Sequence, residues 1–382
     1  MILRVAMLIQ AYHPHVGGAE RQLMALVPLL QARNVEVHIL TRRYSGLQSF
    51  EVIGGAPVHR LPIPGPKAMA SLSFTLCALP LLARLRPHVI HAHELLSPTT
   101  TAIAAKRFLH VPVVAKVLRG GILGDLAKLQ GKPFGQKRLA TFRQQVDGFI
   151  TISREIDEEL AAVGIPQTKR PFIPNGVDMD RFTPVSSQVK QALRAELGLP
   201  QGLIALFTGR LAAEKRVEQL INIWPAVRSA HPKATLLLLG TGEEESKLRQ
   251  IAGEGIRFMG RIENVVPYLQ AADLFILPSA TEGLSNALLE ALAVGLPAIA
   301  SRVGGAPDII EHDQTGWLIP PDQPESLYEA VSLLLADSKR RTLFGQKGRE
   351  RIRRDYSLTV TAERLHQLYH RLLHPHPLAL EA

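Results

Sequence analysis

The feature that most constrains the fold is a repeated alternation of short, largely apolar runs with longer helical patterns. Apolar runs of this kind are typical of parallel strands that are buried on both faces. They occur in both halves of the chain: Ile2–Ile9, Val35–Thr41 and Val111–Val117, then Leu203–Phe207, Ala234–Leu239 and Leu274–Leu277. Such an alternation predicts parallel, doubly wound sheets. We therefore expect an α/β protein with two Rossmann-like domains, whose strand-end loops face each other across a central cleft.

The length of the chain, 382 residues, suits two domains that each bury a core of their own. We expect the first domain over residues 1–180, because a turn signal closes that stretch. Residues 181–201 combine proline and serine with a short helical pattern, and they are interpreted as an interdomain linker. The second domain then covers residues 202–355. A terminal segment, residues 356–382, carries a last helix that could pack back on the first domain.

Composition restricts the class of protein and its surroundings. The single cysteine, Cys77, excludes a disulfide framework and a cysteine-based zinc site, and it fits a reducing compartment. No signal peptide precedes the first strand, and the most apolar stretch, Ala68–Leu85, is marginal for a membrane span. We therefore expect a cytoplasmic protein. Residues 1–180 carry +9 of the net charge of +10, which predicts a phosphate-bearing substrate, an anionic membrane or a nucleic acid as partner of that half.

The strongest candidate site lies within Leu274–Gly305. A strand pattern leads into a loop that contains Glu282, and a short apolar helix follows with Glu290 inside it. A carboxylate in an apolar helix is costly unless hydrogen-bond donors reach it. Backbone N–H groups at a helix start favour an anion. Here they belong to Gly283, Leu284, Ser285 and Asn286. The stretch therefore predicts a phosphate cradle between two carboxylates, which suits a sugar joined to a diphosphate; the alternative is that Glu290 pairs with a buried arginine or caps a loop.

Two further strand ends carry residues that suit an anion. Gly17 and Gly18 follow the first strand and precede a helix, where backbone can approach an anion closely, although many such glycines only make the turn. Arg210 and Lys215 follow the first strand of the second half, and two cations there could neutralise a diphosphate. The alternative for Arg210 and Lys215 is that they are ordinary charged residues on the surface.

His93 ends the strand pattern of residues 87–91 together with His91, at the edge where open α/β sheets bind ligands. A third metal ligand at a clear spacing is lacking, so we do not predict a metal site. A hydrogen-bonding role toward an acceptor and a purely structural role both stay open for His93. Gly260 and Arg261 follow another strand pattern in the second half.

Taken together, these segments resemble the retaining glycosyltransferases of family 4 (group 1), which have the GT-B fold. The resemblance covers nearly the whole chain and is densest in the second half. The segments that carry it are HPHVGGAERQL, VIHAH, PNGVDMDRF, TGRLAAEKRVEQLI, FMGRIENVVPYLQAADLFILPSATEGLSNALLEALAVGLPAIASRVGGAPDII and TGWLIPPDQPESL. Glu282 and Glu290 match the E-x7-E pattern of the family.

The resemblance implies roles in donor binding for the second half. Glu290 corresponds to the carboxylate that binds the ribose hydroxyl groups. Glu282, with the amides that follow it, corresponds to the group that holds the transferred hexose and the distal phosphate. Arg210 and Lys215 correspond to the basic pair that stabilises the leaving diphosphate.

Other residues take their implied roles from the same comparison. Gly17 and Gly18 correspond to the loop that approaches the diphosphate on closure, and His93 falls near the acceptor side. Gly260 and Arg261 lie where the backbone contacts the base. Members of the family need no bound metal ion, so the resemblance implies no metal and no cofactor beyond the nucleotide-sugar substrate.

The chain departs from the family pattern at two places. The strand Val111–Val117 ends in Lys116-Val117-Leu118-Arg119-Gly120-Gly121, without the histidine that the family often has there, so the acceptor pocket is expected to differ. Position 284 is leucine in place of an aromatic residue, which predicts a different fit around the hexose.

The sequence therefore predicts a retaining, metal-independent hexosyltransferase that moves sugar from a nucleoside diphosphate to a glycan or lipid-linked acceptor. One alternative is a nucleotide-sugar epimerase or phosphorylase-like enzyme of the same fold, although a convincing second set of acid and base groups is missing. Another is a non-catalytic sugar- or nucleic-acid-binding protein. The scarcity of aromatic residues near the basic stretches disfavours nucleic acid. The basic first half predicts peripheral contact with the inner face of an anionic membrane.

Overall fold

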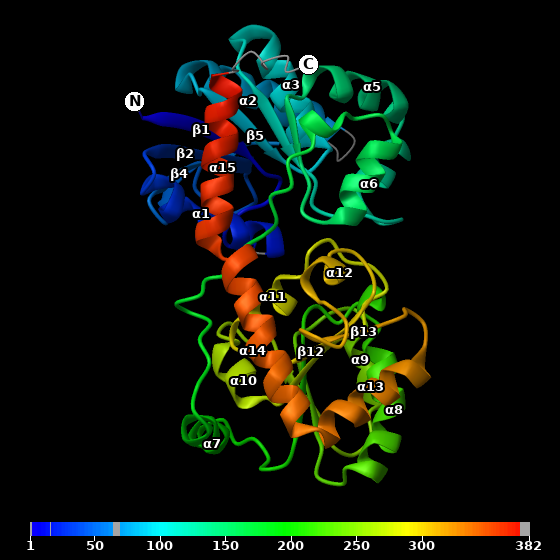
Figure 1. The fold of residues 1–382 in the computed structure, drawn as a ribbon. Helices are drawn as coiled ribbons and strands as arrows, with labels where there is room; N and C mark the ends of the chain where they lie inside the picture. Colours follow the sequence, from blue (N-terminus) through cyan, green and yellow to red (C-terminus); the bar gives the residue numbers. More distant parts are fainter. Residues whose placement is uncertain (1, 16, 64–68, 375–382) are drawn as a thin grey trace, which may run out of the picture. The chain divides into compact units, whose positions relative to one another are not determined.

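The structure, a computed structural model, describes residues 2–15, 17–63 and 69–374. The chain divides into two compact units (Figure 1). The first is Met1–Asn175 together with Leu358–Ala382, and the second is Gly176–Ser357. Residues 375–382 of the expected terminal segment lie outside the described residues.

The first unit is built on a seven-stranded sheet with the order β3-β4-β2-β1-β5-β6-β7. The strands are β1 (Leu3–Leu8), β2 (Val35–Arg42), β3 (Phe50–Ile53), β4 (Ala56–Leu61), β5 (Val89–His93), β6 (Val113–Lys116) and β7 (Gly148–Ile150). The edge strand β3 pairs antiparallel with β4, and the remaining described pairs are parallel. Five of the six residues of β1 are buried, as its apolar run predicts.

Helices cover this sheet and close the first unit. They are α1 (Gly18–Gln31), α2 (Ala70–Leu85), α3 (Ser97–Leu109), α4 (Asp125–Gln130), α5 (Gly135–Gln145), α6 (Arg154–Ala162), the 3-10 turn η2 (Gln167–Lys169) and α15 (Leu358–Leu373). The last helix, α15, packs on α1, and its buried residues Leu358, Ala362, Leu365 and Tyr369 recur at helical spacing (Figure 1). The carboxy-terminal helix therefore belongs to the first unit.

The second unit contains a six-stranded parallel sheet with the order β10-β9-β8-β11-β12-β13. The strands are β8 (Ile204–Thr208), β9 (Thr235–Leu239), β10 (Ile256–Gly260), β11 (Leu274–Leu277), β12 (Ala298–Ser301) and β13 (Trp317–Ile319). The helices are α7 (Ser187–Glu196), the 3-10 turn η3 (Ala213–Lys215), α8 (Val217–Ala230), α9 (Glu245–Ile251), α10 (Val266–Ala271), α11 (Asn286–Ala293), α12 (Ala306–Ile309), α13 (Pro324–Ala336) and α14 (Ser338–Asp355). The prediction of two doubly wound parallel sheets is confirmed.

Both sheets reverse their strand order beside the first strand of the unit. In the first unit the reversal lies between β1 and β5, and in the second it lies between β8 and β11. In open α/β sheets, ligands bind outside the carboxyl ends of the strands at such a point. The topology therefore directs attention to the loops that follow these four strands.

The segment 181–201, which we expected to be an interdomain linker, is part of the second unit. Its helix α7 packs on α10, and the Arg194 side chain is buried. The Arg194 guanidinium donates to the carbonyl of Ala271 at 2.8 Å and to the Asp273 carboxylate at 2.7 Å. The unit boundary accordingly falls at residues 175 and 176 rather than at 180.

No helix among the described residues is both long enough and apolar enough to cross a membrane.

Candidate active site

The loops that follow β8 and β11 meet at the reversal point of the second sheet. Lys215, at the end of the η3 turn after β8, forms an ion pair with Glu282 in the loop after β11, with 2.5 Å between Nζ and Oε1. The Ser279 hydroxyl also donates to Glu282 Oε1 at 2.7 Å, and the backbone N–H of Ala280 donates to the Glu214 carbonyl at 2.8 Å. Two residues that the sequence named separately are therefore brought into direct contact.

Burial makes this pair electrostatically strong. The side chains of Lys215 and Glu282 are only 18% and 10% exposed. A charged hydrogen bond that is shielded from water is stronger than the same contact at the surface. The pair fixes an ammonium group beside the loop that leads into α11.

A second loop, after β12, supports the loop that carries Glu282. Gly304 has a φ of +55°, and a Cβ at this position would lie 2.5 Å from the Glu282 carbonyl oxygen. The Gly305 N–H donates to the Gly283 carbonyl at 2.7 Å. Only glycine allows this backbone conformation and this close approach without strain. The sequence alone did not indicate this role of Gly304.

Helix α11 begins at the same loop. Ser285 is its N-cap, and its hydroxyl accepts from the Leu288 N–H at 3.3 Å. Helix starts carry partial positive charge, so this end of α11 favours an anion. Glu290 lies one turn into the helix and is half-buried rather than enclosed. The Leu284 side chain is buried toward Gly305, so position 284 can contact a donor only through its backbone.

Arg210 occupies a more open position than Lys215. Its side chain is 59% exposed, and it pairs with Glu214 at 2.7 Å and with Glu243 at 3.7 Å. Gly260, at the end of β10, has a φ of +69° and open space on its Cβ side, and Arg261 is exposed. These residues border the same edge of the sheet, because they follow the carboxyl ends of β8 and β10.

Gly17 and Gly18 follow β1 in the first unit, at its reversal point. Gly17 is the N-cap of α1, and its N–H donates to the Glu20 carboxylate at 2.8 Å. The helix start thus already holds an anionic group from the chain itself. A phosphate that bound to the Gly17 amide would replace this carboxylate.

His93 lies in a buried polar cluster at the ends of β5 and β6. Its ring stacks on His91 with 4.4 Å between centroids, and its Nε2 has no hydrogen-bond partner among the described residues. His91 Nδ1 is 2.7 Å from the Tyr369 hydroxyl of α15, and the buried Lys116 ammonium donates to the Asn175 side chain at 2.8 Å. The cluster therefore joins the terminal helix to the centre of the first sheet.

Burial shifts the pKa values in this cluster strongly. It lowers the pKa of Lys116 to about 8 and the pKa of His91 to about 3. Burial, with the charges of His91 and Lys116, also lowers the pKa of His93 well below its ordinary value. His93 is therefore a neutral, enclosed ring at physiological pH, which is a different environment from an open acceptor pocket.

Two carboxyl groups that the sequence analysis missed lie beside this cluster. Glu94 follows His93 directly, has a φ of +88°, and accepts a hydrogen bond from the Gln10 side chain. A residue other than glycine with such a φ is strained, and such strain often occurs at functional sites. Asp125 accepts from the Leu118 N–H at 3.0 Å, and burial raises its pKa to about 7. Neither residue belongs to a sequence motif that would have revealed it.

No group of three or more His, Cys, Asp or Glu side chains that could hold a metal ion occurs within the described parts of the chain. Asp178 and Asp180 have the Asp-x-Asp spacing of some metal sites. However, the Asp178 carboxylate accepts from the backbone N–H groups of Asp180 and Arg181, both at 3.0 Å. This carboxylate therefore stabilises its own turn.

The second unit thus combines a fixed cation, a helix start and two carboxylates around one sheet edge. The cation and the helix start can stabilise an anion such as a diphosphate. Carboxylates accept hydrogen bonds from hydroxyl groups, as on a sugar or a ribose. The arrangement can therefore hold a polyhydroxylated ligand that carries phosphate.

Comparisons with known proteins agree with this arrangement. The family described as "Glycosyl transferases group 1" matches residues 202–337, and "Glycosyltransferase Family 4" matches residues 16–181. A sucrose-phosphate synthase from Thermosynechococcus elongatus has a similar structure, with a TM-score of 0.82 at 22% identity, over 97% of this chain and 99% of that one. The fold is therefore that of the GT-B glycosyltransferases. The chain belongs to glycosyltransferase family 4, group 1.

Two more proteins are similar to this chain. A GDP-mannose-dependent monoacylated α-(1-6)-phosphatidylinositol monomannoside mannosyltransferase of Corynebacterium glutamicum is 36% identical over 206 residues. That alignment covers 50% of this chain and only 54% of the relative. The structure of HepE from Anabaena in complex with UDP-glucose has a TM-score of 0.79 at 18% identity, over 96% of this chain and 99% of that one.

Proposed function

We propose that this glycosyltransferase moves a hexosyl group from a nucleoside-diphosphate sugar to a lipid-linked or glycan acceptor, with retention at the anomeric carbon. The observation that carries the proposal is the buried ion pair of Lys215 and Glu282 beside the start of α11. In this proposal the second unit binds the donor. Lys215 contacts the diphosphate, Glu282 the hexose, and Glu290 the ribose. Gly260 and Arg261 border the base.

The reaction depends most on stabilising the negative charge that develops on the leaving diphosphate. Cleavage of the anomeric C–O bond leaves positive charge on the sugar ring and negative charge on the departing diphosphate. Preorganised donors aimed at the developing charge usually contribute the largest part of such catalysis. Lys215, Arg210 and the start of α11 supply positive charge without a metal ion. Retention implies attack from the face that the diphosphate leaves, with the diphosphate taking the acceptor proton, so we assign no nucleophile and no separate base.

The surface of the first unit favours a lipid-linked acceptor. Ile122 and Phe134, on the loops before α4 and α5, are 88% and 75% exposed, and Leu72 and Leu76 of α2 are also exposed. Hydrogen bonds from Ser97 to Ser71 and from Arg138 to the Leu96 carbonyl hold the starts of α2, α3 and α5 together. These starts lie at the carboxyl edge of the sheet, because α3 and α5 follow β5 and β6.

Basic side chains accompany these exposed apolar groups. Lys132 and Lys137 lie within two to three residues of Phe134 and are themselves exposed. Apolar side chains mixed with lysines suit the surface of an anionic membrane. We infer a cytoplasmic enzyme that contacts the inner face of a membrane peripherally. The relative that acts on a phosphatidylinositol mannoside supports this inference about the acceptor.

A donor screen tests the proposal. Nucleoside-diphosphate sugars with different bases and hexoses are tested for thermal stabilisation of the full chain, and the donors that bind are then assayed for release of nucleoside diphosphate. We expect at least one donor to raise the melting temperature and to be slowly hydrolysed, with faster release when an acceptor is added. Stabilisation by no donor would contradict the proposal. The membrane contact is tested by co-sedimentation with anionic vesicles, and the absence of salt-sensitive binding would contradict it.

A further inference from the structure

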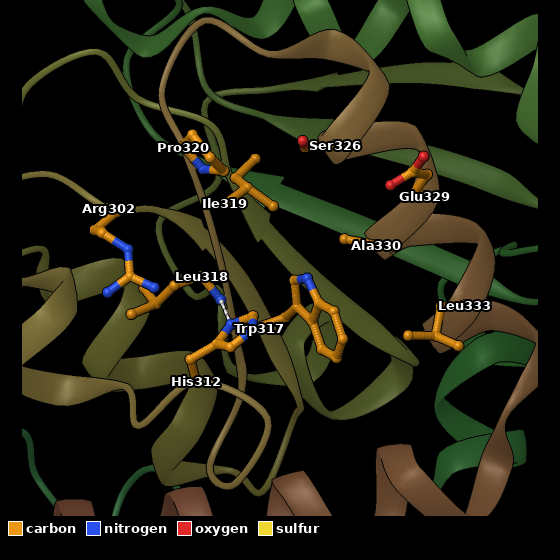
Figure 2. A pocket seen from close by; sticks show the side chains of 10 residues that line it. All are labelled: Arg302, His312, Trp317, Leu318, Ile319, Pro320, Ser326, Glu329, Ala330 and Leu333. Atoms are coloured by element: carbon orange, nitrogen blue, oxygen red, sulfur yellow. Dashed lines mark hydrogen bonds between the residues drawn. The ribbon is translucent and has the colours of Figure 1, made fainter.

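A pocket lies in the second unit between strand β13 and helix α13, and neither Lys215 nor Glu282 lines it. Its volume is about 560 Å³, which falls within the range of roughly 300–1,000 Å³ that is typical of small-molecule sites. Figure 2 shows Trp317 in the middle of the pocket, with Arg302 and His312 on one side and Ser326 and Glu329 on the other. None of these five residues has a role in the proposed donor site.

Several contacts hold the residues on the β13 side of the pocket in place. Trp317 pairs with Ile299 in the sheet, and its ring makes an edge contact with His312 at 4.7 Å between centroids. The Leu318 N–H donates to His312 Nδ1 at 3.1 Å, so a neutral His312 carries its hydrogen on Nε2 as a donor. The loop that holds His312 is closed by a hydrogen bond from the Asp313 N–H to the Gly316 carbonyl at 2.9 Å.

The α13 side presents one helical stripe to the pocket. Ser326, Glu329, Ala330 and Leu333 line it, at the spacing i, i+3, i+4 and i+7 of a single helix face. The stripe therefore places one carboxylate and one hydroxyl above an apolar wall. Helix α13 is 13 residues long, contacts α8 and β13, and buries Leu327 and Val331, so the core holds these groups in place.

The chemistry of the lining favours a neutral saccharide. The face of a sugar ring carries C–H groups that pack on an aromatic ring, and its rim carries hydroxyl groups that need both donors and acceptors. Trp317 supplies the ring, Glu329 an acceptor, and Arg302 and His312 donors. Arg302 and Glu329 carry opposite charges, and the carboxylate disfavours the phosphates of a nucleotide.

We propose that this pocket is a second saccharide-binding site that is separate from the donor site. Arg302 directly precedes the loop at residues 303–305, and Gly305 of that loop donates to the Gly283 carbonyl at 2.7 Å. A saccharide in the pocket is thus held next to the loop that supports Glu282. If the enzyme acts on a glycan, as proposed above, the pocket binds part of that glycan beyond the reacting sugar. The binding itself does not depend on catalysis.

Tryptophan fluorescence of the full chain gives a direct test. The chain has two tryptophans, and Trp224 is fully buried in the core, so a surface ligand at this pocket changes the emission of Trp317. Maltose, cellobiose and α-1,6-mannobiose serve as probes, without nucleotide. We expect at least one of them to change the emission in a saturable way, with a dissociation constant in the millimolar range. No saturable change with any of the three would overturn the proposal.

Substitutions in the pocket test whether the saccharide binds there. Trp317→Ala and Glu329→Ala should each weaken saccharide binding, measured by calorimetry, by about tenfold. The matched control is Glu325→Ala, an exposed carboxylate on the same helix that does not line the pocket, and it should leave the affinity unchanged. Glu290→Ala should also leave it unchanged, which separates this pocket from the donor site. Saccharide binding that survives both pocket variants, or that is lost in Glu290→Ala, would refute a separate site. A Trp317 response to nucleoside diphosphate alone would refute the preference for a saccharide.

Discussion

The substitution Lys215→Met tests the role of the buried cation in the second unit. Methionine keeps most of the side-chain length but removes the ammonium group that lies 2.5 Å from Glu282 Oε1. Loss of one preorganised donor at a developing negative charge costs roughly 2.7–4 kcal/mol, or about 10²–10³ in kcat. We expect a fall of that size in kcat, and a smaller change in the donor KM, because the charge on the diphosphate grows in the transition state.

The same substitution also affects stability, and the two effects must be separated. Glu282 would keep its hydrogen bond from Ser279 but lose its charged partner, at a cost of about 1–3 kcal/mol for a buried group. For a unit of this size, each kcal/mol lowers the melting temperature by about 2–4 °C. Steady-state rates of nucleoside diphosphate release are therefore measured well below the melting temperature of the variant.

A surface lysine provides the control for Lys215→Met. Lys247 also pairs with a carboxylate, that of Glu218, but its side chain is 56% exposed. Lys247→Met should leave kcat within about twofold of the parent, because exposed ion pairs contribute little. If Lys215→Met kept kcat within about threefold of the parent while folded, the cation would not stabilise the leaving group.

Four further predictions concern other parts of the two units. Glu290→Ala should raise the donor dissociation constant by about 10- to 100-fold in calorimetry, because ribose hydroxyls lose a charged acceptor; unchanged affinity would remove Glu290 from the site. Arg210→Ala should lower kcat by less than Lys215→Met, since Arg210 is exposed and screened by solvent, and equal losses in kcat and affinity would indicate ground-state binding only. Gly304→Ala should lower kcat/KM by about 10- to 100-fold by displacing the Glu282 loop, whereas Gly253→Ala, which has open space, should not. Burial raises the pKa of Asp125 to about 7, so between about pH 4 and pH 7 the folded protein keeps a proton that the unfolded chain has lost. The free energy of unfolding therefore falls as pH rises through that window, by at most about 4 kcal/mol. Asp125→Asn should flatten this pH dependence in thermal unfolding, and an unchanged dependence would show that another group causes it.

The sequence predicted the fold well, because apolar runs and helical patterns are local signals. Local patterns also placed Glu282 and Lys215 at strand ends. Local patterns could not predict that these two residues touch. They are 67 positions apart and meet only because β8 and β11 are neighbours in the sheet. The order of strands in the sheet decides such contacts, and a single sequence does not state that order.

Burial was the property that sequence patterns predicted least well. The segment around Arg194 was interpreted as a linker because it combines proline and serine with a short helical pattern, yet its arginine is buried against Asp273. For His93 the sequence left an acceptor-side role and a structural role open, and it did not reveal that the ring is enclosed with His91. The Asp273 carboxylate compensates the charge of Arg194 from 79 positions away, which local patterns do not reveal. His93 Nε2, in contrast, is buried without a hydrogen-bond partner among the described residues. Trp317, similarly, stood within a family motif without any sign that it borders a pocket.

The central claim is that the start of α11 and the pair of Lys215 and Glu282 hold the diphosphate of an activated sugar. The most direct measurement is a crystal structure of the full chain with a nucleoside diphosphate that stabilises it in the thermal screen. We expect phosphate oxygens within hydrogen-bond distance of Lys215 Nζ or of the amides at residues 283–285, and ribose hydroxyls on the Glu290 carboxylate. A nucleotide bound elsewhere, for example in the pocket beside Trp317, with these groups untouched, would contradict it.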